Sequence, residues 1–137
     1  MFSNSGFYAE AARFERAPQG NIAHLALFQK FTDFIDYFEP IVMRFPRYEQ
    51  NVLCANIRNC MYRIMELMIV TNASKNRVAG WHYIDVQIEV LRTYVRRARA
   101  KGSKYLSKRS HETAARKLSE VGRILGGLIN KTKGDRC

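Results

Sequence analysis

The chain of 137 residues has little of what marks membrane or secreted proteins. Its longest strongly apolar stretch, Met61 to Val70, is interrupted by Arg63 and Glu66, whereas a membrane-spanning helix needs about 20 apolar residues. The N-terminal residues contain no apolar segment of the kind that a secretory signal has. The sequence therefore predicts a cytoplasmic protein of one domain with no membrane partner.

Cysteine and catalytic motifs are scarce as well. Cys54, Cys60 and Cys137 are an odd number and match no zinc-binding or redox spacing, so we expect reduced thiols. A glycine-rich phosphate loop, an HExxH pair and a nucleophile elbow are all missing. The histidines fall in three separate segments, at His24, His82 and His111. We therefore predict no enzymatic activity, no catalytic residue, no metal and no cofactor.

Acidic residues are nearly absent from the last third of the chain. Residues 1–91 contain nine Lys/Arg and nine Asp/Glu, whereas residues 92–137 contain fourteen and three. Fourteen minus three gives +11, the whole net charge. Charge of one sign destabilises a compact chain by self-repulsion, so we expect it to bind a polyanion, which releases condensed counterions on binding. An acidic protein surface, a membrane surface and a merely solubilising face are the alternatives.

Proline and turn motifs are sparse, and long alternating runs are lacking, so strands are not indicated. Apolar residues instead recur at steps of three and four in four segments, which is the spacing of amphipathic helices. We expect Pro40 to kink or break the first helix near Asp36–Tyr37, and Pro46 to end it. The four apolar seams are Phe28, Phe31, Ile35, Phe38, Val42 and Phe45; Leu53, Ile57, Cys60, Ile64 and Leu67; Ile84, Ile88, Leu91, Val95 and Ala98; and Ala114, Leu118, Val121, Leu125 and Leu128.

Four amphipathic helices with short links predict an all-α fold, an antiparallel four-helix bundle. A polar loop over residues 71–76 is predicted to separate the second helix from the third, and Gly102 and Gly134 to follow the ends of the third and fourth. Ser107 or Ser110 is suited to cap the start of the fourth helix. The predicted organisation is an N-terminal extension over 1–20, the bundle over 21–133 and a C-terminal tail over 134–137.

The third helix carries a basic stripe. Arg92, Arg96 and Arg99 each follow a core position, so they lie in one row beside the buried seam. Glu89 belongs to the same row and is placed to pair with Arg92. We predict that basic residues of the third helix, the following loop and the fourth helix bind nucleic acid or a protein partner. These candidates are Arg92, Arg96, Arg97, Arg99, Lys101, Lys104, Lys108, Arg109, Arg116, Lys117 and Arg123.

Glycines and tyrosines near this stripe suggest further roles. A glycine inside a helix costs about 1 kcal/mol relative to alanine, yet Gly122 and Gly126 lie four residues apart in the fourth helix. We expect both to allow close packing between helices or between subunits. Tyr94 and Tyr105 are able to stack on a nucleobase, but packing within the bundle is the favoured role for each.

Three runs of residues resemble the accessory variability determinant (Avd) proteins of diversity-generating retroelements. The run Glu120–Gly126 is similar to the signature in the fourth helix of that family, and Leu91–Arg96 to its segment rich in leucine, arginine and aromatic residues. The run Tyr37–Ile41, with Pro46 and Arg47 after it, is similar to the first helix. Four-helix proteins encoded in intervening sequences of ribosomal RNA genes share the fold of this family.

The resemblance implies a homopentameric barrel of four-helix bundles that is strongly basic and not an enzyme. It also implies binding to the retroelement reverse transcriptase and its template RNA, with DNA or an RNA–DNA hybrid as further ligands, in support of mutagenic cDNA synthesis. Arg92 and Arg96 match the basic positions of the family in the third helix, and Arg123 matches the fourth-helix motif. The alternative function is a stand-alone RNA-binding or structural bundle of the ribosomal intervening-sequence type.

Overall fold

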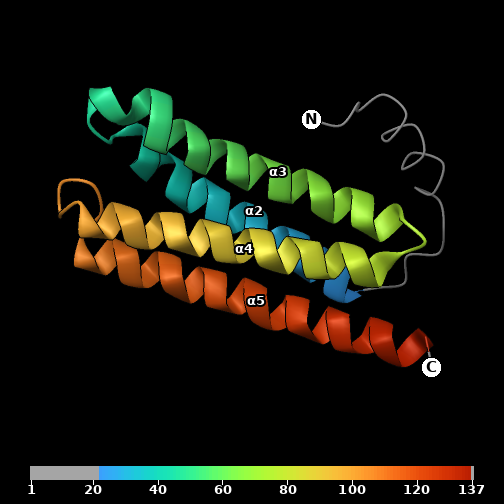
Figure 1. Cartoon of the computed structure of the whole chain (residues 1–137). Helices are drawn as coiled ribbons and strands as arrows, with labels where there is room; N and C mark the ends of the chain where they lie inside the picture. The colour runs from blue at the N-terminus through green and yellow to red at the C-terminus, as the bar shows by residue number, and fades with distance from the viewer. Residues whose placement is uncertain (1–21, 137) are drawn as a thin grey trace.

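The structure, a computed structural model, describes residues 22–136 as four long helices (Figure 1). Successive helices run in opposite directions, and each packs against two others, so the four close into a bundle. The described residues contain no strand, and the prediction of an all-α four-helix bundle is confirmed. The predicted N-terminal extension, residues 1–20, and Cys137 lie outside the described residues. The helices are α2 (Ile22–Met43), α3 (Ala55–Ala73), α4 (Arg77–Ala100) and α5 (Lys108–Arg136).

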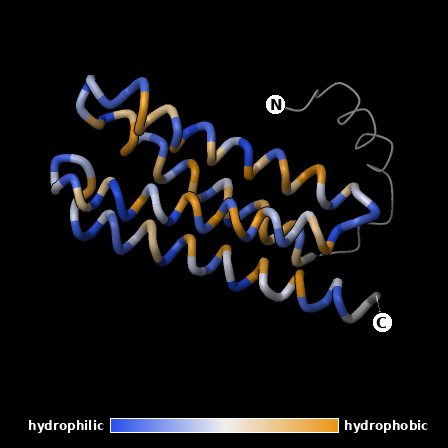
Figure 2. Tube along the Cα trace, in the orientation of Figure 1, coloured by the Kyte–Doolittle hydropathy of each residue, from blue (hydrophilic) through white to orange (hydrophobic). Residues whose placement is uncertain are grey.

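The apolar seams together form the buried core of the bundle, and Figure 2 shows hydrophobic residues recurring along each helix. All the predicted seam residues of α4 and α5 are buried, from Ile84 to Leu128. In α2 and α3 the seams are buried except for Phe28 and Leu67, which are half-buried against the core. Because burial of apolar surface drives folding, these seams determine how the helices face one another. The core also contains large side chains outside the seams, namely Leu27, Phe34, Met61, Met68, Trp81 and Leu106.

Pro40 lies inside α2, and of the kink or break expected near Asp36–Tyr37 the break does not occur, because the helix continues without interruption to Met43. A proline removes one backbone hydrogen bond from a helix interior. Here Phe38 and Val42, on either side of it, are fully buried in the core. Their packing keeps the last turn helical despite the missing bond. As expected, the helix ends before Pro46.

A tight corner joins α2 to α3. It contains a 3-10 turn, η1 (Arg47–Glu49), followed by a π-helical segment, η2 (Gln50–Cys54). The side-chain amide of Gln50 donates hydrogen bonds to the carbonyl oxygens of Phe45 at 3.0 Å and Met43 at 3.4 Å. These bonds satisfy carbonyl groups that the end of α2 leaves without a helical partner. The corner therefore has a defined conformation in which Leu53 and Cys54 are both buried.

The link between α3 and α4 is shorter than predicted. The polar loop was expected to begin at Thr71, but Thr71 and Asn72 are buried residues of α3, which ends at Ala73. Gly80 of α4 explains the burial of Thr71. A Cβ atom at Gly80 would lie 2.4 Å from the Cγ2 atom of Thr71, so only glycine permits this approach of the two helices. The polar residues Thr71 and Asn72 thus belong to a helix because of tertiary packing.

The loop between α4 and α5 turns at Gly102, whose φ of 122° lies in a region that favours glycine. Ser107 caps α5, because its Oγ atom accepts a hydrogen bond from the backbone N–H of Ser110 at 3.1 Å. Of the two predicted caps, Ser107 is therefore the one used. The expectation that Gly134 follows the end of this helix is wrong, since α5 continues to Arg136.

Two further predictions concern the thiols and the membrane. Cys54 and Cys60 are free and buried, as expected of reduced thiols, and burial raises the pKa of each. Among the helices of residues 22–136, none combines the length and the apolar character that crossing a bilayer requires.

Candidate nucleic-acid interface

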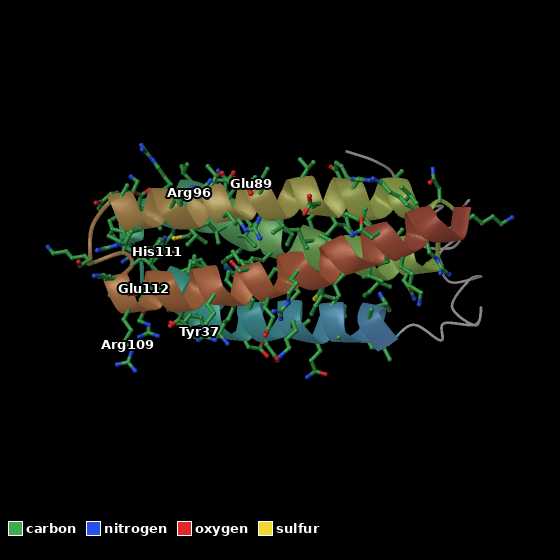
Figure 3. The ribbon with its side chains drawn as sticks, turned by 90° about the horizontal axis from the view of Figure 1, so that it is seen from below. Tyr37, Glu89, Arg96, Arg109, His111 and Glu112 are labelled. Atoms are coloured by element: carbon green, nitrogen blue, oxygen red, sulfur yellow. The ribbon has the colours of Figure 1, made fainter. Side chains whose placement is uncertain are left out.

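Glu89 holds two arginines of the predicted stripe on α4. Its carboxylate accepts hydrogen bonds from Arg92 Nη1 at 3.2 Å and from Arg96 Nη2 at 3.3 Å. The bonds from Arg92 and then from Arg96 lower the pKa of Glu89. The predicted pairing of Glu89 with Arg92 is confirmed, and Figure 3 shows Arg96 beside Glu89 along the same helix. Two cations and one anion leave this cluster with a net charge of +1.

Arg92 also joins α4 to α5. Its Nη2 atom donates a hydrogen bond to the backbone carbonyl oxygen of Leu118 at 3.3 Å. Gly122 makes this contact possible, because a Cβ atom at that position would lie 2.6 Å from the same Nη2 atom. The predicted packing role of Gly122 therefore takes a specific form, namely room for a guanidinium group that crosses the surface of α5.

A groove of about 250 Å³ runs between α4 and α5 beside this contact. Its apolar part is formed by Val95, Ala115 and Leu118, while cationic and polar side chains complete the lining. Figure 3 shows His111 between the two helices. A groove with arginines above an apolar floor suits an anionic group carried on an apolar stem. The cationic and polar lining residues are Arg92, Arg96, His111 and Ser119.

Arg99 and Lys101, predicted as binding residues, make contacts within the chain. Arg99 Nη1 donates to the carbonyl oxygen of Leu106 at 3.1 Å and fixes the α4–α5 loop. Lys101 Nζ lies 2.7 Å from the buried carboxylate of Glu49, which also accepts a hydrogen bond from the Tyr105 hydroxyl at 2.7 Å. These bonds, with that of Lys101 first, lower the pKa of Glu49. The two cations therefore connect the loop to α4 and to the α2–α3 corner.

Five of the predicted cations have no hydrogen bond or ion pair within the described part of the chain. All five are exposed, and they lie near the α4–α5 loop, at the end of α4 and in the first turns of α5. Figure 3 shows one of them, Arg109, extending away from the bundle. Side chains of this kind contact phosphates without breaking an internal pair. They are Arg97, Lys104, Lys108, Arg109 and Arg116.

The remaining two predicted cations on α5 have partners on their own or a neighbouring helix. Lys117 Nζ lies 5.4 Å from the centroid of the Tyr37 ring on α2, which is a cation–π distance. Arg123 lies 3.7 Å from Glu120, which also pairs with Lys30 of α2 at 3.3 Å. The basic residues thus divide into those used within the bundle and those left for an external anion.

A comparison with protein families matches residues 25–132 to the family described as bAvd-like. The chain belongs to the bAvd-like family. This confirms the resemblance to accessory variability determinant proteins. A comparison with curated proteins gives no match. The matched range includes α3, α4, most of α2 and α5, and therefore all the predicted binding residues.

Gly126, unlike Gly122, has no neighbour that explains it in this bAvd-like chain. A Cβ atom built at Gly126 or at Gly127 would meet no described atom within 4 Å outside its own helix. Packing within the single bundle therefore accounts for Gly122 alone. A role of Gly126 at a boundary between subunits stays a prediction.

Both tyrosines considered in the sequence pack against the bundle, as favoured, and the exposed aromatic ring of this region is a third tyrosine. Tyr105 is buried, and its ring packs on Phe45 with centroids 5.2 Å apart, so the favoured packing role is confirmed. Tyr94 is half-buried and packs against the core. Sequence reasoning missed Tyr48, which is 78% exposed although its hydroxyl oxygen lies 3.1 Å from that of Tyr105. The only local signal was an aromatic residue next to Arg47 in a short link after Pro46.

Metal binding has no support in the described residues, where no group of three or more His, Cys, Asp or Glu side chains is placed to hold an ion. The cationic groove and the exposed cations are suited to bind anions.

Proposed function

We propose that the chain is a non-enzymatic accessory subunit of a retroelement reverse transcriptase, which binds the polymerase and its template RNA in support of mutagenic cDNA synthesis. The family match over residues 25–132 carries this proposal. The concentration of positive charge in residues 92–137 supports it, because phosphate backbones are the commonest polyanionic ligands of basic domains.

RNA phosphates bind the exposed cations around the α4–α5 loop in this proposal. The five exposed cations make no hydrogen bond or ion pair within the described residues, so they can follow a phosphate backbone without breaking one. Binding of this kind is weakly selective for base sequence and weakens steeply as the salt concentration rises. Arg109 and Arg116 are the clearest candidates, since both are exposed on α5.

The polymerase binds the groove between α4 and α5. Arg92 is held by Glu89 and by the Leu118 carbonyl oxygen, so its guanidinium group is oriented before a partner arrives. Oriented guanidinium groups favour bidentate pairing with carboxylates. An acidic side chain of the polymerase that enters the groove takes the place of Glu89 at Arg92 and Arg96, and its apolar stem contacts Val95 and Leu118.

Copurification of the tagged protein with reverse transcriptase and RNA tests the two surfaces separately. The double variant Arg109→Gln/Arg116→Gln is expected to retain the polymerase. The negative slope of log affinity against log salt is expected to become shallower by about 2, roughly one for each phosphate contact. The control Arg63→Gln removes an exposed cation of α3 and is expected to leave the slope unchanged. RNA recovered with no polymerase would favour the stand-alone RNA-binding bundle. A salt slope near zero for the wild-type protein would contradict the electrostatic mechanism.

Glu89→Gln tests the groove, because it removes the internal competitor of an acidic partner. An exposed ion pair contributes up to about 1 kcal/mol, so polymerase affinity is expected to rise by about two- to fivefold. Glu112→Gln is the matched control, since it removes an exposed carboxylate of α5 that has no bond to Arg92 or Arg96. An equal gain in both variants would show a general charge effect and contradict the proposed displacement.

Assembly as a homopentamer is part of the same proposal. Five copies carry 5 × 11 = +55 charges, so apolar contact between subunits must offset their repulsion. Gly126 is proposed to lie at this contact, because no described residue outside its own helix comes within 4 Å of a Cβ atom built there. Light scattering at physiological salt is expected to give a mass near five times 15.9 kDa. A monomer across micromolar concentrations would contradict the pentamer.

A further inference from the structure

One end of the bundle presents an aromatic ring that is both exposed and anchored. The side chain of Tyr48 is 78% exposed, yet its hydroxyl oxygen lies 3.1 Å from the hydroxyl oxygen of Tyr105. The single hydroxyl proton of Tyr105 is donated to Glu49 at 2.7 Å, so the Tyr48 hydroxyl is the donor to the Tyr105 oxygen. A ring fixed at its far end loses little conformational freedom when a ligand stacks on it.

The cluster beneath this ring is rigid. Glu49 is buried and accepts hydrogen bonds from both Lys101 and Tyr105. The Tyr105 ring packs on Phe45, and the Lys101 ammonium lies 5.6 Å from the centroid of the Tyr105 ring. Groups from the α2–α3 corner and from the α4–α5 loop therefore meet here, and they hold the backbone that carries Tyr48.

A basic residue stands next to each tyrosine of this cluster in the sequence. Arg47 precedes Tyr48 in the chain, and Lys104 precedes Tyr105 in the facing loop; both are exposed. The acidic group of this cluster, Glu49, is already paired with Lys101. An anchored aromatic face beside cations is the combination with which proteins bind single-stranded nucleic acid, where bases stack and phosphates pair with Lys or Arg.

We infer that Tyr48 is a stacking platform for one base of a single-stranded nucleic acid, with the flanking phosphates bound by Arg47 and Lys104. The inference rests on the proposed function in assuming a nucleic-acid ligand, and it adds the class of that ligand. Duplexes are excluded from this site because their bases are already stacked on one another. A strand whose phosphates follow the α4–α5 loop reaches the site at the end of the bundle.

Binding of a ten-nucleotide oligouridine to the full-length protein, followed by fluorescence anisotropy, tests this site. Loss of a stacked base is expected to weaken binding in Tyr48→Ala by roughly 5- to 100-fold, with an unchanged salt slope because no charge is removed. Tyr48→Phe keeps the stacking face but loses the hydroxyl that anchors the ring, so it is expected to bind more weakly than the wild type and more tightly than Tyr48→Ala. Affinity for a duplex of equal length is expected to be unchanged in both variants.

Tyr83→Ala is the matched control, because Tyr83 is a 49% exposed tyrosine on the outer side of α4. It is expected to bind the oligouridine as the wild type does. An effect of Tyr48→Ala below twofold, or equal losses for duplex and single strand, would overturn the inference while the proposed function stands. Loss of the polymerase with full retention of the oligouridine would also overturn it, and would make this end a protein-docking surface. Absence of any nucleic-acid binding at low salt would instead contradict the proposed function.

Discussion

The contact between Gly122 and Arg92 allows a quantitative test of how α4 and α5 fit together. In Gly122→Ala the new Cβ atom would lie 2.6 Å from Arg92 Nη2, so the guanidinium group must move away from the Leu118 carbonyl oxygen. The loss of that hydrogen bond costs about 1 kcal/mol. Alanine in place of glycine in a helix interior returns about 1 kcal/mol. The expected net change in the free energy of unfolding is therefore close to zero.

Gly127→Ala provides the comparison, because among the described residues no atom outside its own helix lies within 4 Å of its new Cβ atom. It is expected to stabilise the protein by the full helix-propensity gain of about 1 kcal/mol. In an Arg92→Ala background the clash disappears, so Gly122→Ala is expected to stabilise by the same amount. The double-mutant cycle between Arg92 and Gly122 then gives a coupling energy of about 1 kcal/mol.

Urea unfolding followed by circular dichroism measures these differences. With the typical dependence of the free energy of unfolding on urea concentration for small domains, a change of 1 kcal/mol shifts the urea midpoint of unfolding by roughly 0.5 M. Each series is measured at several protein concentrations, because an oligomer makes apparent stability depend on concentration. If Gly122→Ala stabilises as much as Gly127→Ala in both backgrounds, the glycine does not make room for Arg92 and the reasoning fails.

Three other changes are expected to have distinct effects. Gly80→Ala should lower the free energy of unfolding by about 1–3 kcal/mol, because its Cβ atom meets the buried Thr71 side chain; an unchanged melting temperature would contradict this. Glu49 has a lowered pKa in the folded state, so its contribution is present above the unfolded pKa of about 4.3 and is lost as the pH falls through the folded value. Acid unfolding of Glu49→Gln should therefore depend less on pH than that of the wild type. Arg99→Ala should speed amide exchange in the α4–α5 loop through loss of the bond to Leu106, and unaltered exchange would refute that role.

Much of the fold could be predicted from the sequence because the apolar spacing is regular. The seam of α5, from Ala114 to Leu128, is buried at every predicted position, since one face of a long amphipathic helix determines its orientation. Leu106 could not be predicted as core, because it lies in a loop whose path depends on Gly102 and Arg99. The π-helical segment over 50–54 has no local sequence signal either.

The row of arginines on α4 and its pairing with Glu89 could be predicted from the sequence, but the contacts of this row with other helices could not. Spacing along α4 correctly placed Arg92, Arg96 and Arg99 in one row. The structure shows that Arg92 also contacts Leu118, and this depends on the register of α5 against α4. Periodicity within one helix contains no information on that register, which is set by packing between helices. The anchored ring of Tyr48 depends in the same way on contact between two distant segments.

The rates at which a thiol reagent modifies the two buried cysteines report how often the bundle opens around each of them. Cys54 lies at the α2–α3 corner, where its Sγ atom is 3.3 Å from the Val42 carbonyl oxygen, whereas Cys60 faces α4 near the Gln87 carbonyl oxygen. A thiol reagent modifies either residue only when its surroundings open, because burial both blocks access and disfavours the reactive thiolate. Equal modification rates would mean that the helices separate together. Faster modification of Cys54 would mean that the corner opens while α3 and α4 stay in contact.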